Sequence, residues 1–252
     1  MLRVHILASG SDGNCIVLES DEGSVMIDAG LSGRGISELM SKCELCHRDL
    51  KGILISHEHG DHIRGAGVLS RRFNVPVLAN HATLEASPIG EVKSELFRSG
   101  EQFQCGPFSI LPLPTFHDAI DPVCFSVEHD GRKILVATDT GRLSDEIEAE
   151  LAVADLAVIE SNYDPQMLRD GPYPAHLKKR IDSDFGHLSN VRCGQALERT
   201  DTGNGRQVFL AHLSRNNNNP DIARETVASI TGIKRLFIDC LEFPGDYRSI
   251  TV

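Results

Sequence analysis

Short runs of aliphatic and β-branched residues recur along the chain, and most are closed by Gly, Pro, Asn, Asp or Ser. Such runs predict buried strands, whereas apolar residues spaced three and four apart predict helices. The first third therefore predicts strand, hairpin, helix and strand, with Asp21-Glu22-Gly23 as the hairpin turn. The predicted strands lie within residues 3–7, 15–30, 53–55 and 75–80, and the predicted helices are 32–42 and 63–73.

The remaining two thirds repeat this alternation. The segment from Asp164 to Asp184 contains three prolines and is predicted to be irregular. Because the strands form two sets, each followed by helices, the order favours two packed sheets with helices outside. No linker rich in Pro, Gly or Ser divides the sequence, so we expect a single domain spanning 1–252. Strands are predicted in 106–116, 123–139 (hairpin turn at Asp130-Gly131), 155–161, 206–214 and 235–243, and helices in 189–199 and 220–230.

Composition narrows the class of protein. An apolar content of 40% and a charged content of 24% are ordinary for a soluble globular protein. No apolar run is long enough to span a bilayer, and the N-terminus is too soon polar for a signal peptide. Seven cysteines without a framework spacing predict free thiols in a reducing cytoplasm.

The net charge of -11 disfavours a protein that grips nucleic acid over its whole surface. Bound divalent metal would reverse that sign locally. Local basic groups also occur, at Arg71-Arg72, Lys178-Lys179-Arg180 and Arg215. Of these, Lys178-Lys179-Arg180 is the best-placed partner surface that we can name.

The stretch ILISHEHGDHI, residues 53 to 63, carries the clearest chemical signal. His57 and His59 lie two apart after a buried strand, so their side chains point the same way in an extended segment. Gly60 lets the chain turn, and Asp61 and His62 then open a helix. Imidazoles with carboxylates suit zinc, manganese or iron, and the absence of thiolate argues against a purely structural zinc site.

Four further polar residues each end an apolar strand. Taken singly, each would be a strand-end polar group or a helix cap. Together with HxHxDH they indicate a site assembled from distant parts of the sequence, since folds place such residues at strand ends. These residues are Asp28, His117, Asp139 and His212.

This order of residues resembles the metallo-β-lactamase-fold hydrolase superfamily over nearly the full length of the chain. The resemblance implies an α/β fold, a four-layer αββα sandwich, with two divalent metal ions (zinc or manganese, with iron as a further option). It assigns His57, His59 and His117 to one metal and Asp61, His62 and His212 to the other. It also implies that Asp139 bridges the two metals and that Asp28 orients a ligand histidine.

Several separated blocks, among them GSDGNC, ESNYD, GHLSN and AHLSRNNNNP, resemble the YycJ/WalJ-type, exonuclease-like members. His62 completes a full second metal site in this resemblance, and many true β-lactamases lack this histidine in the motif. The resemblance therefore implies a phosphodiesterase acting on nucleic acid, with DNA as the expected substrate. In such a site the nucleophile is a hydroxide bridging the two metals.

Hydrolysis also needs a group that donates a proton to the departing oxygen. Two similar segments, HLSN and HLSRNNNNP, each precede a predicted helix. Asn219-Pro220 has the form of a helix N-cap and first residue. We predict that His187 is a phosphate ligand or general acid, against the alternative of a surface histidine beside an ordinary cap. The candidate catalytic residues are Asp61, Asp139 and His187, and the candidate substrate-binding residues are Ser189, Asn190, Ser214 and Asn216.

Two rival functions remain open. One is a small-molecule phosphodiesterase or thioesterase of the same fold, which the acidic net charge favours mildly. The other is a non-hydrolytic diiron redox or binding protein. His5, His47, His81, His129 and His176 lack partners in sequence and are interpreted as ordinary histidines, and Cys43 and Cys46 as two free thiols.

Overall fold

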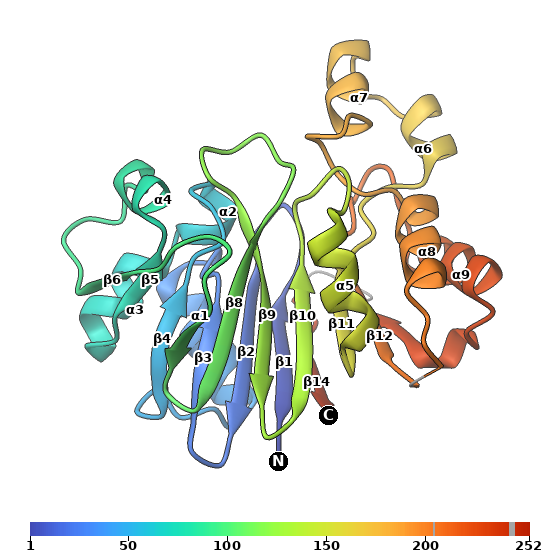
Figure 1. Cartoon of the computed structure of the whole chain (residues 1–252). Coiled ribbons are helices and arrows are strands. Elements are labelled where there is room, and N and C mark those ends of the chain that lie inside the picture. Colours follow the sequence, from blue (N-terminus) through green and yellow to red (C-terminus); the bar gives the residue numbers. More distant parts are fainter. Residues whose placement is uncertain (204, 242–244) are drawn as a thin grey trace. The chain divides into compact units, whose positions relative to one another are not determined.

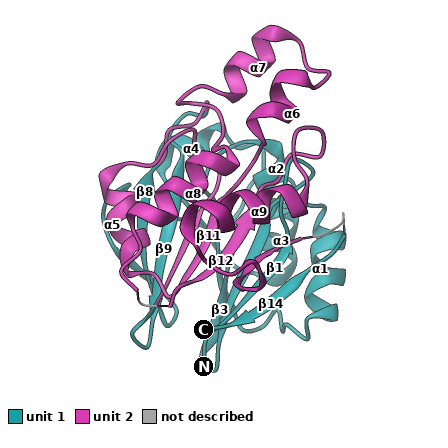
Figure 2. Cartoon of the chain, turned by 90° about the vertical axis from the view of Figure 1, so that its right-hand side faces the viewer, with its two compact units in different colours: residues 1–114, 119–132, 243–252 teal, residues 115–118, 133–242 magenta. Residues whose placement is uncertain are grey.

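The computed structural model describes residues 1–203, 205–241 and 245–252. It divides into two compact units, which Figure 2 colours separately. The first unit comprises Met1–Pro114, Ala119–Arg132 and Phe243–Val252, and the second comprises Thr115–Asp118 and Lys133–Glu242. The single domain expected from the sequence remains a prediction.

A seven-stranded mixed sheet forms the first unit. The neighbouring strands pair antiparallel from 248–251 through 3–8 and 15–20 to 23–27. From 23–27 through 50–54 and 77–79 to 94–96 they pair parallel. The sheet order is β14 (Arg248–Thr251), β1 (Arg3–Ala8), β2 (Cys15–Ser20), β3 (Gly23–Ile27), β4 (Leu50–Leu54), β5 (Val77–Ala79) and β6 (Ser94–Leu96) (Figure 1).

Two helices cover this sheet with their apolar faces. Ile36 and Met40 of α1 (Gly33–Lys42) and Leu69 of α3 (Ala66–Phe73) belong to the same buried cluster as the inward residues of β1 to β5. The unit also contains α2 (Gly60–Ile63), α4 (His81–Ala86) and the antiparallel strands β7 (Phe103–Cys105), β8 (Phe108–Pro114) and β9 (Val123–His129).

The second unit is built on parallel strands. Residues of β11 are buried throughout, as expected for a parallel sheet covered on both faces. Helices α8 and α9 lie over β11 and β12 in Figures 1 and 2. The strands are β10 (Arg132–Ala137), β11 (Leu156–Glu160), β12 (Gln207–Ala211) and β13 (Ile238–Cys240), and the helices are α5 (Asp145–Val153), α6 (Pro165–Asp170), α7 (Ala175–Ile181), α8 (Asn190–Arg199) and α9 (Pro220–Thr231).

Local turn and cap predictions are confirmed. Strands β2 and β3 pair antiparallel across the predicted turn at residues 21–23. Asp130 and Gly131 both have positive φ, at 50° and 72°, which is the conformation of a tight hairpin turn. The Asn219 side chain accepts from the Asp221 N–H and caps α9, with Pro220 as its first residue.

The helix predicted for residues 63–73 is wrong as a single element. Helix α2 ends at Ile63 and α3 begins at Ala66. Between them, the Gly65 N–H donates to the Ala29 carbonyl at 2.7 Å. A Cβ at Gly65 would lie 2.5 Å from the Leu31 carbonyl oxygen, so the break lets this backbone pass close to the β3–α1 loop.

The strand predicted for residues 235–243 is also largely wrong. Arg235–Phe237 is a 3₁₀ helix, and β13 covers only Ile238–Cys240. Leu236 and Phe237 are 76% and 59% exposed, so their apolar character does not reflect core packing. Residues 242 and 243 lie outside the described part of the chain.

The prediction lacked several helices, α4 (His81–Ala86) among them. The irregular stretch predicted for 164–184 holds α6, capped by Asp164 and begun by Pro165, and then α7. Helix α5 begins after Ser144, whose hydroxyl accepts from the Ile147 N–H. Both starts carry recognisable cap residues. In the described part of the chain, no helix is long and apolar enough to cross a membrane.

Gly30 lies where two loops of the first unit touch. Its N–H donates to the Asn14 carbonyl, and Asn14 N–H donates to the Asp61 carbonyl, each at 2.8 Å. A Cβ at Gly30 would lie 1.6 Å from that Asp61 oxygen, so a side chain forces the backbone apart.

Gly30→Ala is therefore expected to lower the free energy of unfolding by about 1–3 kcal/mol or more, as overpacking does. Gly60→Ala is the matched control, because a Cβ there meets nothing within 4 Å. Urea unfolding of both variants checks this expectation. Equal stability of the two variants would contradict the close loop contact.

Candidate metal centre

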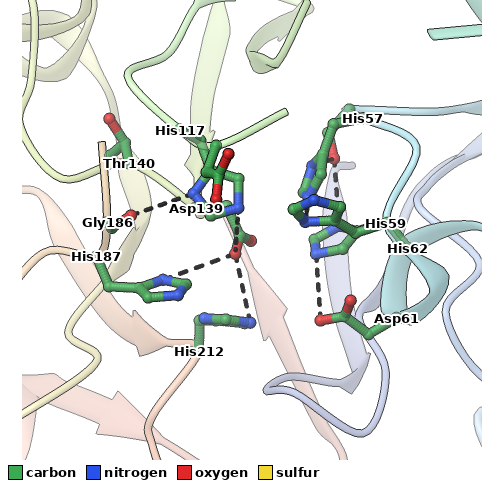
Figure 3. Close-up of polar contacts among 12 residues, drawn as sticks. His57, His59, Asp61, His62, His117, Asp139, Thr140, Gly186, His187 and His212 are labelled. Atoms are coloured by element: carbon green, nitrogen blue, oxygen red, sulfur yellow. Dashed lines mark hydrogen bonds and ion pairs between the residues drawn. The ribbon is translucent and has the colours of Figure 1, made fainter. Parts of the chain in front are cut away.

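The first group of predicted ligands lies directly after β4 in the first unit (Figure 3). His57 and His59 follow the strand, and His57 Nε2 lies 3.1 Å from His59 Nδ1. His59 is the N-cap residue of α2, so Asp61 and His62 belong to the first turn of that helix. His62 Nε2 lies 3.6 Å from Asp61 Oδ2. The structure thus brings the four HxHxDH side chains together.

The spacing of these nitrogens fits a metal ion. Two imidazole nitrogens bound tetrahedrally to zinc at about 2.0–2.1 Å are about 3.3 Å apart. The 3.1 Å between His57 Nε2 and His59 Nδ1 is close to that value. The group offers imidazole and carboxylate donors and no thiolate, which suits zinc, manganese or iron.

Asp28 fixes two of these rings from behind. Its Oδ2 lies 2.7 Å from His62 Nδ1 and accepts from the Ser56 hydroxyl at 2.8 Å. That hydroxyl lies 3.0 Å from His57 Nδ1 and can accept its proton. With both Nδ1 atoms protonated, the lone pairs of His57 and His62 are left on Nε2, as a metal requires.

The second group lies at the carboxyl ends of the parallel strands in the second unit. Asp139 comes two residues after β10, Glu160 is the last residue of β11, and His212 follows β12. Because neighbouring parallel strands end at one edge, residues far apart in sequence become neighbours there. Asp139, Glu160, His187 and His212 have potential ligand atoms that lie within 4.8 Å of one another.

Asp139 is the focus of this group, as Figure 3 shows. Its Oδ1 lies 3.6 Å from His212 Nε2 and 3.8 Å from His117 Nε2. The same oxygen lies 3.8 Å from His187 Nδ1. A carboxylate facing several imidazoles in this way has the arrangement of a ligand that can be shared between ions.

His117 presents a neutral ring to Asp139. Its Nδ1 lies 3.1 Å from the Gly186 carbonyl, to which it donates. Burial lowers the pKa of His117, outweighing the opposing effect of the Asp139 charge. A neutral ring with its proton on Nδ1 keeps the Nε2 lone pair available for a metal.

Glu160 is the site residue that the sequence analysis missed. It is fully buried, and its Oε1 lies 2.7 Å from His187 Nδ1 and 3.1 Å from His212 Nδ1. Its Oε2 accepts from the Thr140 and Leu188 N–H groups at 2.9 and 3.3 Å. The signal in the sequence was a carboxylate ending an apolar strand, the same signal that identified Asp28 and Asp139.

The protonation state of Glu160 follows from these partners. Burial alone raises the pKa of this carboxyl, but the charge of His187 and hydrogen bonds from His187 and His212 outweigh it. The pKa of Glu160 is therefore held below that of an ordinary glutamate. As an acceptor, the carboxylate holds the proton of each histidine on Nδ1.

Three predicted site residues have an unusual backbone conformation. Asp28, Asp139 and His212 have φ of 58°, 55° and 56°, in the left-handed region that most side chains avoid. Each lies within two residues of the end of a strand. Left-handed non-glycine residues of this kind persist where surrounding contacts hold them, and they concentrate at functional sites.

The structure gives the predicted substrate-binding residues defined contacts. Ser189 is buried and caps α8 by accepting from the Arg192 N–H. Asn190 is buried and hydrogen-bonds to Ser161 and Asn218. Substrate binding by these residues stays a prediction, and their capping and network contacts belong to the fold.

The two other candidates lie after β12. Ser214 accepts from the Asn217 N–H, and exposed Asn216 donates to the Tyr173 hydroxyl. His187 has features of both interpretations made from the sequence. Its side chain is 21% exposed and it precedes a capped helix, as a surface histidine would. It also contacts the buried Glu160, as a site residue would.

Histidines outside these groups have ordinary surroundings. His5 is buried, with its two ring nitrogens near Ser249 and Glu19, and burial lowers its pKa. His47 stacks on Phe73 with ring centroids 4.5 Å apart. All seven cysteines, Cys43 and Cys46 included, are thiols rather than disulfides, as predicted.

Comparisons with known proteins agree with this geometry. A family model described as "Beta-lactamase superfamily domain" matches residues 24–213. Exodeoxyribonuclease YycJ of Bacillus anthracis is 38% identical over 234 residues, covering 91% of this chain and 89% of that protein. Exodeoxyribonuclease WalJ of Streptococcus pneumoniae (strain D39) is also 38% identical over 234 residues, covering 90% and 87%.

A solved structure supports the fold independently. The metallo-β-lactamase fold protein YhfI of Bacillus subtilis superposes with a TM-score of 0.75, covering 96% of this chain and 97% of that one at 18% identity. The fold class predicted from the sequence, an α/β sandwich of the metallo-β-lactamase type, is therefore confirmed.

Glu160→Gln is expected to lower metal affinity about 10–100-fold, the usual effect of losing a group that orients a ligand. A glutamine can still accept from Thr140 and Leu188, but its NH₂ would face the two histidines. Those rings would then carry their proton on Nε2, the atom that the metal needs.

Metal titration of the chelator-treated protein checks this, with Glu225→Gln on the exposed surface of α9 as the control. Circular dichroism establishes that both variants remain folded. Unchanged affinity in folded Glu160→Gln would contradict the orienting role.

Proposed function

This chain belongs to the metallo-β-lactamase superfamily, and we propose that it is a two-metal nuclease that degrades DNA from a strand end. Its relatives make it a metal-dependent hydrolase, and its clusters of histidine and aspartate support binding of divalent metal. The observation that carries the proposal is the 38% identity to two exodeoxyribonucleases along about nine tenths of the chain.

The proposal treats the two ligand groups as parts of one centre, as the resemblance implies, and it therefore requires the single domain expected from the sequence. His57, His59 and His117 would hold one ion. Asp61, His62 and His212 would hold the other, with Asp139 shared between them. Each group supports this separately, since each presents imidazole nitrogens beside a carboxylate.

The chemistry divides between ions and side chains. When bound, two divalent ions would supply Lewis-acid activation of water and of the attacked phosphate, and therefore no serine or cysteine nucleophile is needed. The protein's own side chains orient the ligand histidines: Asp28 holds His62 directly and His57 through Ser56. In the second unit, Glu160 holds His212.

His187 supplies the proton for the departing oxygen. Its Nδ1 is held by the Glu160 carboxylate at 2.7 Å, so Nε2 is the atom from which it donates. The partial exposure of the ring, 21% of the side chain, leaves it accessible to a substrate. Glu160 fixes the orientation of the His187 ring and acts through it as a positioning residue.

The cellular setting follows the same reasoning. Seven thiols without a disulfide favour a reducing compartment, so we propose the cytoplasm. DNA is the proposed partner, and zinc or manganese the proposed ions.

The purified protein is expected to release nucleotides from end-labelled DNA, with activity falling steeply as salt rises. Phosphate contacts release counterions, and this produces the salt dependence. Metal content is measured on the same sample, and single- and double-stranded DNA, RNA, a generic phosphodiester and a thioester are tested in parallel. Turnover of the thioester alone, or of none of these, would defeat the nuclease proposal.

His187→Ala is expected to lower the rate of DNA hydrolysis about 10²–10⁴-fold with unchanged metal content, the usual contribution of a general acid. The loss should be much smaller for a nitrophenyl phosphodiester, whose leaving group departs without protonation. His81→Ala, a change of an exposed histidine on α4, is the control. An equal loss on both substrates would refute proton donation by His187.

A further inference from the structure

Two phenylalanines flank the histidines of the second unit. Phe116 directly precedes His117, and Phe185 lies two residues before His187. Their rings pack edge to face, with centroids 6.0 Å apart at an interplanar angle of 70°. The two histidine rings lie 5.3 Å apart, between centroids, so an aromatic pair adjoins a histidine pair.

Phe185 is exposed, although its backbone is firmly held. The side chain is among the large apolar groups left open, at 57% exposure. The next two residues are pinned: the His187 N–H donates to the Ile181 carbonyl, and the Gly186 carbonyl faces His117 Nδ1. A Cβ at Gly186 would lie 2.2 Å from the Arg180 carbonyl, so this loop packs closely.

Scattered exposed apolar side chains are common and need no explanation. Phe185 differs because it packs against Phe116 in a closely packed loop and lies two residues before His187 in the chain. An apolar ring exposed to water in that position is unfavourably solvated and is not buried in the core. The arrangement fits a surface that something flat and apolar covers when substrate is bound.

Two arginines lie near the aromatic pair. The Arg142 guanidinium lies 3.5 Å from the centre of the Phe116 ring. Arg142 and Arg192 both reach Asp184, the residue before Phe185, at 3.9 and 3.5 Å. The chain carries a net charge of -11, so arginines gathered at this place favour an anionic partner.

We propose that Phe185, backed by Phe116 and Arg142, is a stacking platform for an unpaired base of the DNA strand being cut. Single-stranded nucleic acid is bound by aromatic side chains on which bases stack, beside basic groups that follow the backbone. Guanidinium groups over aromatic rings add to such surfaces. This inference rests on the nuclease proposal and names what positions its substrate.

The platform predicts faster hydrolysis of strands that carry a base at the nucleotide that stacks on Phe185. Single-stranded DNA is compared with strands in which one of the first four nucleotides at the attacked end is abasic. The wild-type protein should lose about tenfold or more in kcat/KM for one abasic position, since stacking on one aromatic side chain is worth that much. Phe185→Ala should cut the intact and abasic strands at nearly equal rates.

The readout is the ratio of kcat/KM for the intact strand to that for the abasic strand, measured in the wild-type protein and in Phe185→Ala. A merely structural effect of the substitution would lower both values and keep their ratio. Phe185→Trp should restore the preference. Phe237→Ala, a change of a phenylalanine that is 59% exposed elsewhere in the same unit, should keep it.

An unchanged preference in Phe185→Ala would overturn the platform and leave the nuclease proposal intact. A change of oligomeric state in that variant, with the preference unchanged, would assign the ring to contact with a second copy and also overturn the platform. Failure of the wild-type protein to hydrolyse any DNA would overturn the nuclease proposal itself.

Discussion

The buried carboxylate of Glu160 is the interaction on which the second unit's site depends. It contacts His187 and His212 through one oxygen and the backbone N–H groups of Thr140 and Leu188 through the other. Four segments that are distant in sequence therefore meet at one charge. Its full burial makes these partners obligatory, because an unpaired carboxylate in that position would be costly. The same contacts place a proton of each histidine on Nδ1, so that each ring presents Nε2 on the side away from Glu160.

In the first unit, Asp28 is the buried carboxylate that orients the histidine rings. This carboxylate holds His62 directly and His57 through the Ser56 hydroxyl. In both units a buried acid lies behind the rings, so that the imidazoles are fixed before any metal arrives. The backbone is left-handed at Asp28, Asp139 and His212, where the chain turns away from the ends of strands. Strain at such positions is stabilised by the hydrogen bonds around them.

Much of this arrangement could be predicted from local sequence. Strand runs ending in Asp28, Asp139 and His212 were visible because a buried strand closed by one polar residue is a strong local pattern. Glu160 was overlooked because its importance comes from partners 27 and 52 residues away. Likewise, the break between α2 and α3 depends on contact with Ala29 and Leu31, which nothing in residues 63–73 shows. The 3₁₀ turn at 235–237 appeared strand-like because exposed Leu236 and Phe237 mimic core residues.

The central claim is that hydrolysis needs two ions held by this set of histidines and aspartates. The most direct measurement titrates the metal-free protein with zinc or manganese while DNA hydrolysis and bound metal are followed together. The account predicts two equivalents bound per chain, with hydrolysis appearing as the second equivalent binds. Full activity at one equivalent, or two bound ions without hydrolysis of DNA, would contradict it.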